Sequence, residues 1–256
     1  MRPYPDYGFI LSHDERQNSS YNALQLGLER RFREGFFLSV SYTFSKFLDY
    51  NEDNFSQMFP MDPYNLRLER GLSQSHFPHR FVTGAVYDLP FGKGKRHLTG
   101  GWPAVIAGGW QLASILTLQS GDQVWITQSA NTSRMFSRQF RPNLVGTPVL
   151  GGDERNLNRW FNTVAFQAPP PMAIGNSNKF PDVQGPGLVG VDASVLRSFS
   201  IPAREGMRFE LRGDFFNLPN RTNFSPPSGT FGTPNFGRIT GARLARTIQL
   251  GLKFWF

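Results

Sequence analysis

The sequence predicts an all-β fold, because three of its properties agree. Apolar and polar residues alternate with a period of two in several segments, each about ten residues long. The 26 Gly and 19 Pro residues gather mainly in the connections between these segments. No stretch approaches the roughly 18 consecutive apolar residues that a membrane-spanning helix needs. Strands that alternate with connections rich in turn-forming residues are typical of an all-β protein.

Seven segments carry the alternation, and we expect each of them to be a strand. The clearest is Phe36–Lys46, in which the large apolar residues at even positions lie on one face and Ser and Thr at odd positions lie on the other. Arg80–Leu89 is ambiguous in register, because both of its faces are partly apolar. Tyr7–Ser12 could supply an eighth strand. The other expected strands are Ser19–Phe32, Trp110–Gln119, Leu188–Phe199, Arg208–Asn217 and Thr247–Phe256.

Strand length and loop length together predict that these strands cross a membrane. A tilted strand needs about ten residues to cross a bilayer, whereas strands of soluble sheets most often have five or six. Short connections, such as Arg33–Gly35, alternate with long ones near 49–79, 120–187 and 218–244. Outer-membrane barrels have short periplasmic turns and long extracellular loops. We therefore expect an antiparallel transmembrane β-barrel, and a soluble β-sandwich is the alternative.

One face of the sixth strand carries four consecutive charged residues of alternating sign. Arg208, Glu210, Arg212 and Asp214 share this face, and Phe209, Leu211 and Phe215 share the other. If the apolar face meets lipid, the four charged residues line a polar lumen. The alternative is a charged stripe that faces solvent and discourages aggregation.

The remaining features argue against other function classes. The net charge is +8, but the basic residues are scattered, so we expect no nucleic-acid binding. The chain has no Cys and no defensible catalytic arrangement, so we expect neither an enzyme nor a cofactor or metal site. Asp49, Asn51 and Asp53 imitate the start of a calcium loop, yet Asn54 replaces its Gly and Pro60 its Glu. If a ligand binds, we expect it at the 120–187 loop, which contains Trp160.

The N-terminus has no apolar segment of signal-peptide type. Either the chain remains in the cytoplasm, or it is the later part of a longer exported protein. An incomplete set of strands points to the second interpretation, because bacterial barrels have an even number of strands. We thus expect about seven to eight strands of a larger barrel.

Four stretches resemble the C-terminal barrel of TonB-dependent outer-membrane receptors, most closely the Oar-like type. They are SSYNALQLGLERRFREGFFLSVSYTFSKFLD, HRFVTGAVYDLPFGKGK, GGWQLASILTLQSGDQ and RFELRGDFFNLPNRTNF. The resemblance implies a barrel of about 22 strands with a plug in its lumen, energised by the TonB system. Residues 1–256 would be the C-terminal part of that barrel, without the plug domain. It also implies uptake or surface recognition at the outer membrane of a Gram-negative cell. The alternative is a small autonomous porin or adhesin barrel.

The resemblance also suggests a role for the final strand. In such barrels an alternating last strand that ends in Phe resembles the signal read by the barrel assembly machinery, and a free strand edge can accept another chain. The residues concerned are Ile248, Leu250, Leu252, Phe254 and Phe256. The expected partners are therefore outer-membrane lipid, the assembly machinery, the remaining barrel strands and plug, and the TonB system.

Overall fold

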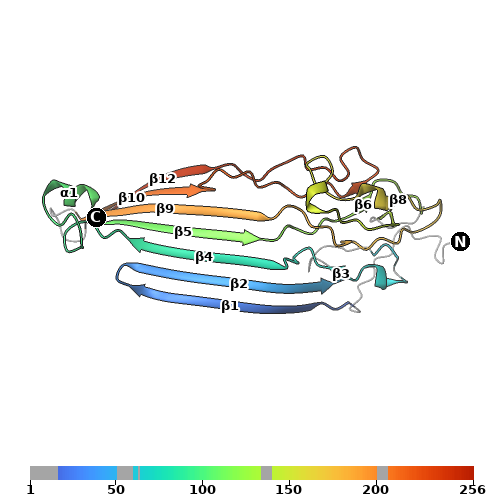
Figure 1. Ribbon diagram of the computed structural model, residues 1–256, viewed down its shortest axis with the longest axis horizontal. Helices are drawn as coiled ribbons and strands as arrows, with labels where there is room; N and C mark the ends of the chain where they lie inside the picture. Colours follow the sequence, from blue (N-terminus) through green and yellow to red (C-terminus); the bar gives the residue numbers. More distant parts are fainter. Residues whose placement is uncertain (1–16, 51–59, 63, 134–139, 201–206) are drawn as a thin grey trace.

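The computed structural model describes residues 17–50, 60–62, 64–133, 140–200 and 207–256. Seven long strands lie side by side in one antiparallel sheet, in the order in which they follow one another along the chain (Figure 1). The two-residue strand β3 (Gly71–Leu72) extends this sheet beside β2. The long strands are β1 (Ser20–Arg33), β2 (Phe36–Asp49), β4 (His79–Asp88), β5 (Trp110–Gln119), β9 (Leu188–Ser200), β10 (Arg208–Phe216) and β12 (Thr247–Trp255).

All seven predicted strands are present, with small changes at their ends. The first strand is shifted by one residue and keeps the expected length of 14 residues, and the second extends three residues further than expected, to Asp49. The possible eighth strand, Tyr7–Ser12, lies outside the described residues. A short helix that the sequence did not predict, α1 (Gly101–Ala107), precedes β5. It was missed because the segment has only seven residues, one of which is a Pro, and therefore shows little helical periodicity.

The register places the apolar sides of all seven strands on the same face of the sheet. One row across five strands reads Leu26, Tyr42, Phe81, Leu118 and Val189. The register of β4, which the sequence left ambiguous, is thereby fixed with Phe81 on the apolar face. The adjacent row on the opposite face reads Gly27, Ser41, Val82, Thr117 and Gly190, and most of its side chains are small. The sheet therefore has one apolar face and one face of small and polar side chains.

The connections are sorted to the two ends of the sheet (Figure 1). At one end, which we call the turn end, lie the β1–β2 turn, the segment that contains α1, and the end of β12. The β1–β2 turn is tight, and Glu34 and Gly35 adopt positive φ angles of 56° and 80°. At the other end lie the described parts of 50–78, 120–187 and 217–246, which we call the loop cap. The β1–β2 turn is short and the three connections of the loop cap are long, as expected, whereas the connection that contains α1, residues 89–109, is of intermediate length.

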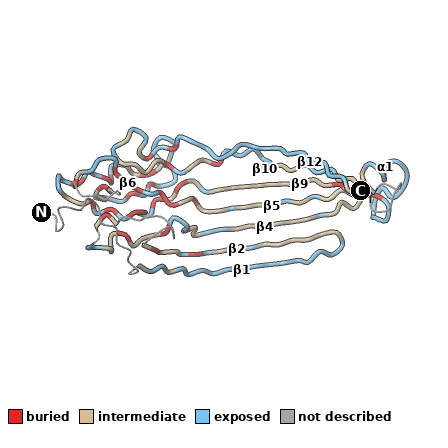
Figure 2. The backbone as a smooth tube through the Cα atoms, turned by 180° about the vertical axis from the view of Figure 1, so that it is seen from behind, coloured by how far each residue is buried: buried red, intermediate tan, exposed pale blue. Residues whose placement is uncertain are grey.

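The buried core of the molecule lies in the loop cap and not between the strands. Figure 2 shows most of the buried residues gathered at that end, whereas most residues of the long strands are half-buried or exposed. Two small sheets order the cap: β6 (Thr127–Gln128) pairs with β11 (Thr230–Phe231), and β7 (Asn143–Leu144) with β8 (Phe166–Gln167). Two 3₁₀ turns, Gly152–Glu154 and Thr163–Ala165, complete it, and a third, Leu66–Leu68, precedes β3. The core side chains are Val124, Ile126, Phe161, Ala165, Phe166 and Val183.

The sheet is open, and its two outer strands run in the same direction. Among the described residues, β1 and β12 each pair with only one long strand, so each leaves a free edge. Because neighbouring strands alternate in direction, the first and the seventh both run from the loop cap towards the turn end (Figure 1). These seven strands therefore cannot close on themselves as an all-antiparallel barrel. Closure requires an odd number of further strands.

Candidate functional site

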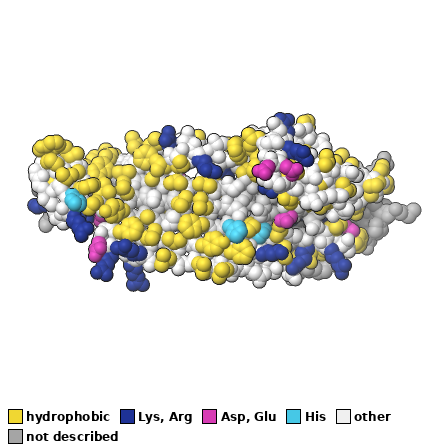
Figure 3. Space-filling view, viewed as in Figure 1, with side chains coloured by type: hydrophobic (Ala, Val, Ile, Leu, Met, Phe, Trp, Pro, Cys, Tyr) yellow, Lys and Arg dark blue, Asp and Glu magenta, His cyan; other side chains and the backbone are white. Residues whose placement is uncertain are grey.

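The apolar face of the sheet is uncovered within the part of the chain that the structure describes. Leu250, near the middle of β12, is 77% exposed. Figure 3 shows hydrophobic side chains spread over the strands. A continuous apolar surface of this extent marks a membrane or protein interface. Exposed members of this face include Leu24, Leu26, Leu28, Phe44, Leu112, Leu118, Leu211, Ile248, Leu252 and Phe254.

The final strand presents the residues of the expected assembly signal on this same face. Ile248, Leu250, Leu252 and Phe254 stand opposite apolar residues or Gly213 of β10. Phe256 follows the end of β12 and is almost fully exposed, and its ring stacks on that of Phe254 with centroids 5.9 Å apart. The outer edge of β12 has no strand beside it among the described residues. The geometry leaves this edge open, and the signal role remains a prediction.

The four charged residues of β10 share the opposite, polar face. Asp214 is the centre of this group: it accepts a hydrogen bond from the Ser194 hydroxyl, and the Arg212 Nε lies 2.9 Å from its Oδ2. Glu210 stands opposite Lys253 of β12 and Ser198 of β9 in the strand register. The Arg208 guanidinium lies 4.0 Å from the centroid of the Trp255 ring.

The Ser194 bond to Asp214 connects β10 to β9, the Arg208 contact with Trp255 connects β10 to β12, and the ion pair of Arg212 with Asp214 lies within β10. Two charges of opposite sign that also share hydrogen bonds can lie on a water-filled face at little energetic cost. The structure therefore brings Arg208, Glu210, Arg212 and Asp214 together on the face that is not apolar. Their position in a lumen remains a prediction.

A buried ion pair ties two distant segments of the loop cap together. Arg141 donates two hydrogen bonds to the Glu69 carboxylate, at 3.0 Å and 2.6 Å. Both side chains are only 1% exposed. The Met61 backbone N–H donates a further bond of 2.9 Å to Glu69 Oε1. A bidentate pair with an additional donor is the geometry that a buried carboxylate requires.

The 120–187 loop, expected to be a ligand-binding region, is itself a packed structure. Trp160 packs against the buried core, and its indole Nε1–H donates a 2.8 Å hydrogen bond to the Gln184 carbonyl. Arg243 pairs with Asp122 at 2.7 Å and connects this loop to the 217–246 segment. The sequence analysis missed this core, although Val124, Ile126 and Phe161 were its visible signal. Trp160 is therefore a partly buried packing residue of the cap.

Within the described ranges, the structure contains no cluster of three or more His, Asp or Glu residues that could hold a metal ion. Asn51, Asp53 and Asn54 of the calcium-like motif lie outside the described residues. His76 accepts a hydrogen bond at Nδ1 from the Phe47 backbone N–H, and His79 lies 2.9 Å from the Tyr42 hydroxyl. Both histidines therefore have structural partners. No helix among the described residues is long and apolar enough to span a membrane.

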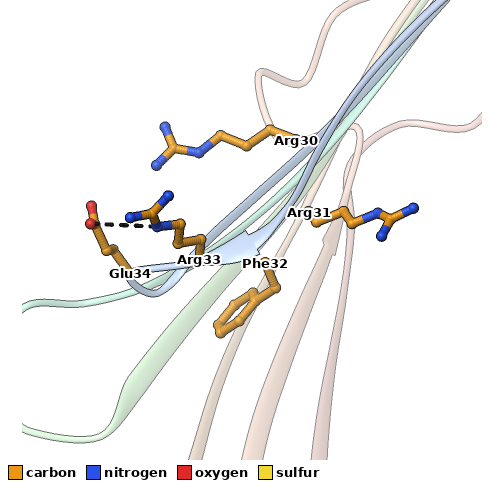
Figure 4. A pocket seen from close by; sticks show the side chains of 5 residues that line it. All are labelled: Arg30, Arg31, Phe32, Arg33 and Glu34. Atoms are coloured by element: carbon orange, nitrogen blue, oxygen red, sulfur yellow. Dashed lines mark ion pairs between the residues drawn. The ribbon is translucent and has the colours of Figure 1, made fainter.

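A hollow beside the β1–β2 turn is lined by a single hairpin (Figure 4). Arg30, Arg31, Phe32, Arg33 and Glu34 line it, and Arg33 and Glu34 form an ion pair of 3.8 Å. The side chains of this pair are 82% and 74% exposed. A pocket that holds a small molecule normally buries most of its ligand, and this open arrangement does not.

The long antiparallel strands, their two chemically different faces and the sorted connections define a transmembrane β-barrel domain. The chain belongs to the outer membrane β-barrel domain family, because the model of that family matches residues 1–249. Membership places the protein in the outer membrane and excludes the soluble β-sandwich. None of the curated proteins compared with this chain matches it.

Proposed function

We propose that this chain is part of the barrel of a TonB-dependent receptor, which takes up or recognises a substrate at the outer membrane of a Gram-negative cell. The observation that carries the proposal is the open sheet whose apolar sides all lie on one face. In an outer-membrane barrel this face meets lipid, and the opposite face borders the lumen. On this proposal, Arg208, Glu210, Arg212 and Asp214 face the lumen or a plug within it.

The shape of the sheet favours a large barrel over an autonomous one of about eight strands. In an eight-stranded barrel a single strand would separate β1 from β12, so the sheet would have to curl until these two strands were near neighbours. Figure 1 instead shows β1 and β12 at opposite borders of a broad sheet. An eight-stranded barrel must also fill its interior with side chains. The row from Gly27 to Gly190 offers mostly small ones.

The loop cap supports a role in recognition. Loops on a rigid scaffold carry most binding functions, and a packed core holds these loops in one conformation. On this proposal the cap lies on the outer side of the membrane, and the turn end lies in the periplasm. The assembly machinery would recognise β12, and the remaining strands would join at the edges of β1 and β12.

Two measurements on the complete outer-membrane protein that contains this chain test the proposal. Its purified form should bind the periplasmic domain of TonB, and it should conduct little current in a planar bilayer, because a plug fills the lumen. Steady open-channel conductance together with no TonB binding would instead identify a porin. That outcome would overturn the receptor assignment and leave the barrel fold intact.

A further inference from the structure

Helix α1 exposes an apolar stripe at the turn end of the sheet. Trp102, Val105 and Ile106 are 74%, 67% and 60% exposed. Their spacing of three and four residues places them on one side of the helix. Nothing within the described residues covers these side chains. An exposed apolar cluster of this kind, with a Trp at its edge, indicates a site of interaction with a membrane or a protein.

Two side chains of the apolar face fix the position of α1. The Arg197 guanidinium donates to the Val105 and Ile106 carbonyls, and the Trp110 Nε1–H donates to the Ile106 carbonyl at 3.0 Å. Arg197 and Trp110 stand opposite each other in the register and in the same row as Leu211, on the apolar side of the sheet. The carbonyls of the last helical turn lack partners within the helix, and a cation near them is favourable.

Arg197 would be costly on a lipid-facing surface if it were free. It is instead 8% exposed, and its guanidinium lies 5.4 Å from the Trp110 ring centroid and 4.1 Å from that of Phe199. The helix thereby covers the Arg197 guanidinium, and the guanidinium holds the last turn of the helix on the lipid side of the turn end. Consequently, the end of α1 that carries Val105 and Ile106 is held beside the apolar face of the sheet.

The connection that leads into α1 carries exposed positive charge. Lys93 and Arg96 are both exposed, while Lys95 lies 3.6 Å from the Asp88 carboxylate. This basic segment folds back on the helix: Gly92 and Gly108 approach so closely that a Cβ on Gly92 would lie 2.6 Å from the Gly108 Cα. Figure 3 shows basic side chains beside hydrophobic ones at this end of the molecule.

We propose that α1 is an interfacial anchor, which lies in the headgroup region of the leaflet next to the turn end. Trp102, Val105 and Ile106 enter the boundary between headgroups and acyl chains, and Lys93 and Arg96 bind lipid phosphate groups. Short amphipathic helices bind membranes through this combination of apolar and basic side chains, and Trp prefers the interface. The proposal rests on the lipid-facing assignment of the sheet made above.

The experiment uses the absence of cysteine, since any introduced Cys is unique in this chain. In the complete barrel, inserted into phosphatidylcholine–phosphatidylglycerol vesicles, an environment-sensitive fluorophore is attached at Trp102→Cys, Leu250→Cys or Val164→Cys in separate variants. Cysteines native to other parts of that protein are replaced first. Leu250 is the lipid-facing control, and Val164, 74% exposed in the loop cap, is the water-facing control.

We expect a blue-shifted emission at position 102 that nitroxides near the headgroups quench at least twofold more strongly than nitroxides deep in the acyl chains. The order should reverse at position 250, and neither nitroxide should quench the label at position 164. A water-like signal at 102 beside a lipid signal at 250 overturns the anchor and leaves the orientation of the sheet intact. A water-like signal at 250 overturns the orientation of the whole sheet.

A second set of variants tests the basic residues. Lys93→Gln with Arg96→Gln should reduce the blue shift at position 102 in vesicles that contain phosphatidylglycerol, and should leave the signal at 250 unchanged. In pure phosphatidylcholine the same pair should have a smaller effect, because the zwitterionic surface attracts cations less. An equal effect in both lipids would refute the phosphate-binding role of these two side chains.

Discussion

Replacing Arg141 with Met should destabilise the loop cap strongly. The substitution preserves an unbranched side chain of similar length but leaves the Glu69 carboxylate buried without its cation. Both partners are 1% exposed, so water cannot compensate for the lost charge. The Met61 N–H still donates to Glu69, but a single amide cannot replace a bidentate guanidinium. Breaking a buried pair in this way costs about 3–5 kcal/mol.

Hydrogen exchange provides the assay, because the loss should be confined to the cap. An example of an amide that bonds across the cap is the Ile126 N–H, which donates to the Lys179 carbonyl. Such amides should exchange faster by roughly two to three orders of magnitude, because each tenfold change in rate corresponds to about 1.4 kcal/mol. Strand amides, such as those shared by β4 and β5, should change little. This contrast separates unfolding of the cap from unfolding of the sheet.

The double variant Glu69→Leu with Arg141→Met is the matched control. It removes both charges, so its cost should be well below the sum of the two single changes. If Arg141→Met leaves cap exchange within about threefold of the native rate, the pair does not stabilise the cap and the reasoning from burial fails. If the strands lose protection together with the cap, the two parts unfold as one unit.

Three further predictions address the membrane face, the terminus and pH. Leu250→Arg should destabilise the assembled barrel by about 2–4 kcal/mol in lipid vesicles, whereas Gln249→Arg on the opposite face should cost far less; equal costs would contradict the facing. Deletion of Phe256 should lower outer-membrane insertion in cells, and unchanged insertion would refute the assembly signal. Burial lowers the pKa of His76 from its usual value of 6.5. The stability that neutral His76 contributes to the cap should therefore be fully present above pH 6.5, and it should be lost as the pH falls from 6.5 to the lower pKa of the folded state. His76→Gln should flatten this decline in proteolysis experiments on the cap, and a decline of unchanged size would rule out His76 as its source.

The long strands and their faces could be predicted from the sequence, because a period of two leaves a local record. In β2 the alternation from Phe36 to Phe44 assigns each side chain to a face without knowledge of any neighbour. The pairing of the first two strands also followed, since a tight turn joins antiparallel neighbours. The register of β4 did not follow. Val82 and Val86 make its second face apolar too, and only pairing with β2 and β5 assigns Phe81 to the apolar side.

The packing of the long connections could not be predicted, because it depends on contacts between distant residues. Glu69 and Arg141 are 72 positions apart, and neither lies in a periodic segment. The same holds for α1: its contact with Arg197 joins residues 91 and 92 positions apart, and seven helical residues carry too little pattern to be recognised. For the candidate site, the sequence found the charged side of β10 but not the bond from Ser194 to Asp214.

The shared direction of β1 and β12 restricts any strand that joins either edge. A strand added at either edge must run from the turn end towards the loop cap, antiparallel to its neighbour. It must also bring its apolar side chains into phase with Leu24, Leu26 and Leu28 at one edge, or with Leu250 and Leu252 at the other. A slip of one residue would turn its whole apolar set inwards. The two edges of the sheet thus determine both the direction of an added strand and the positions of its apolar residues.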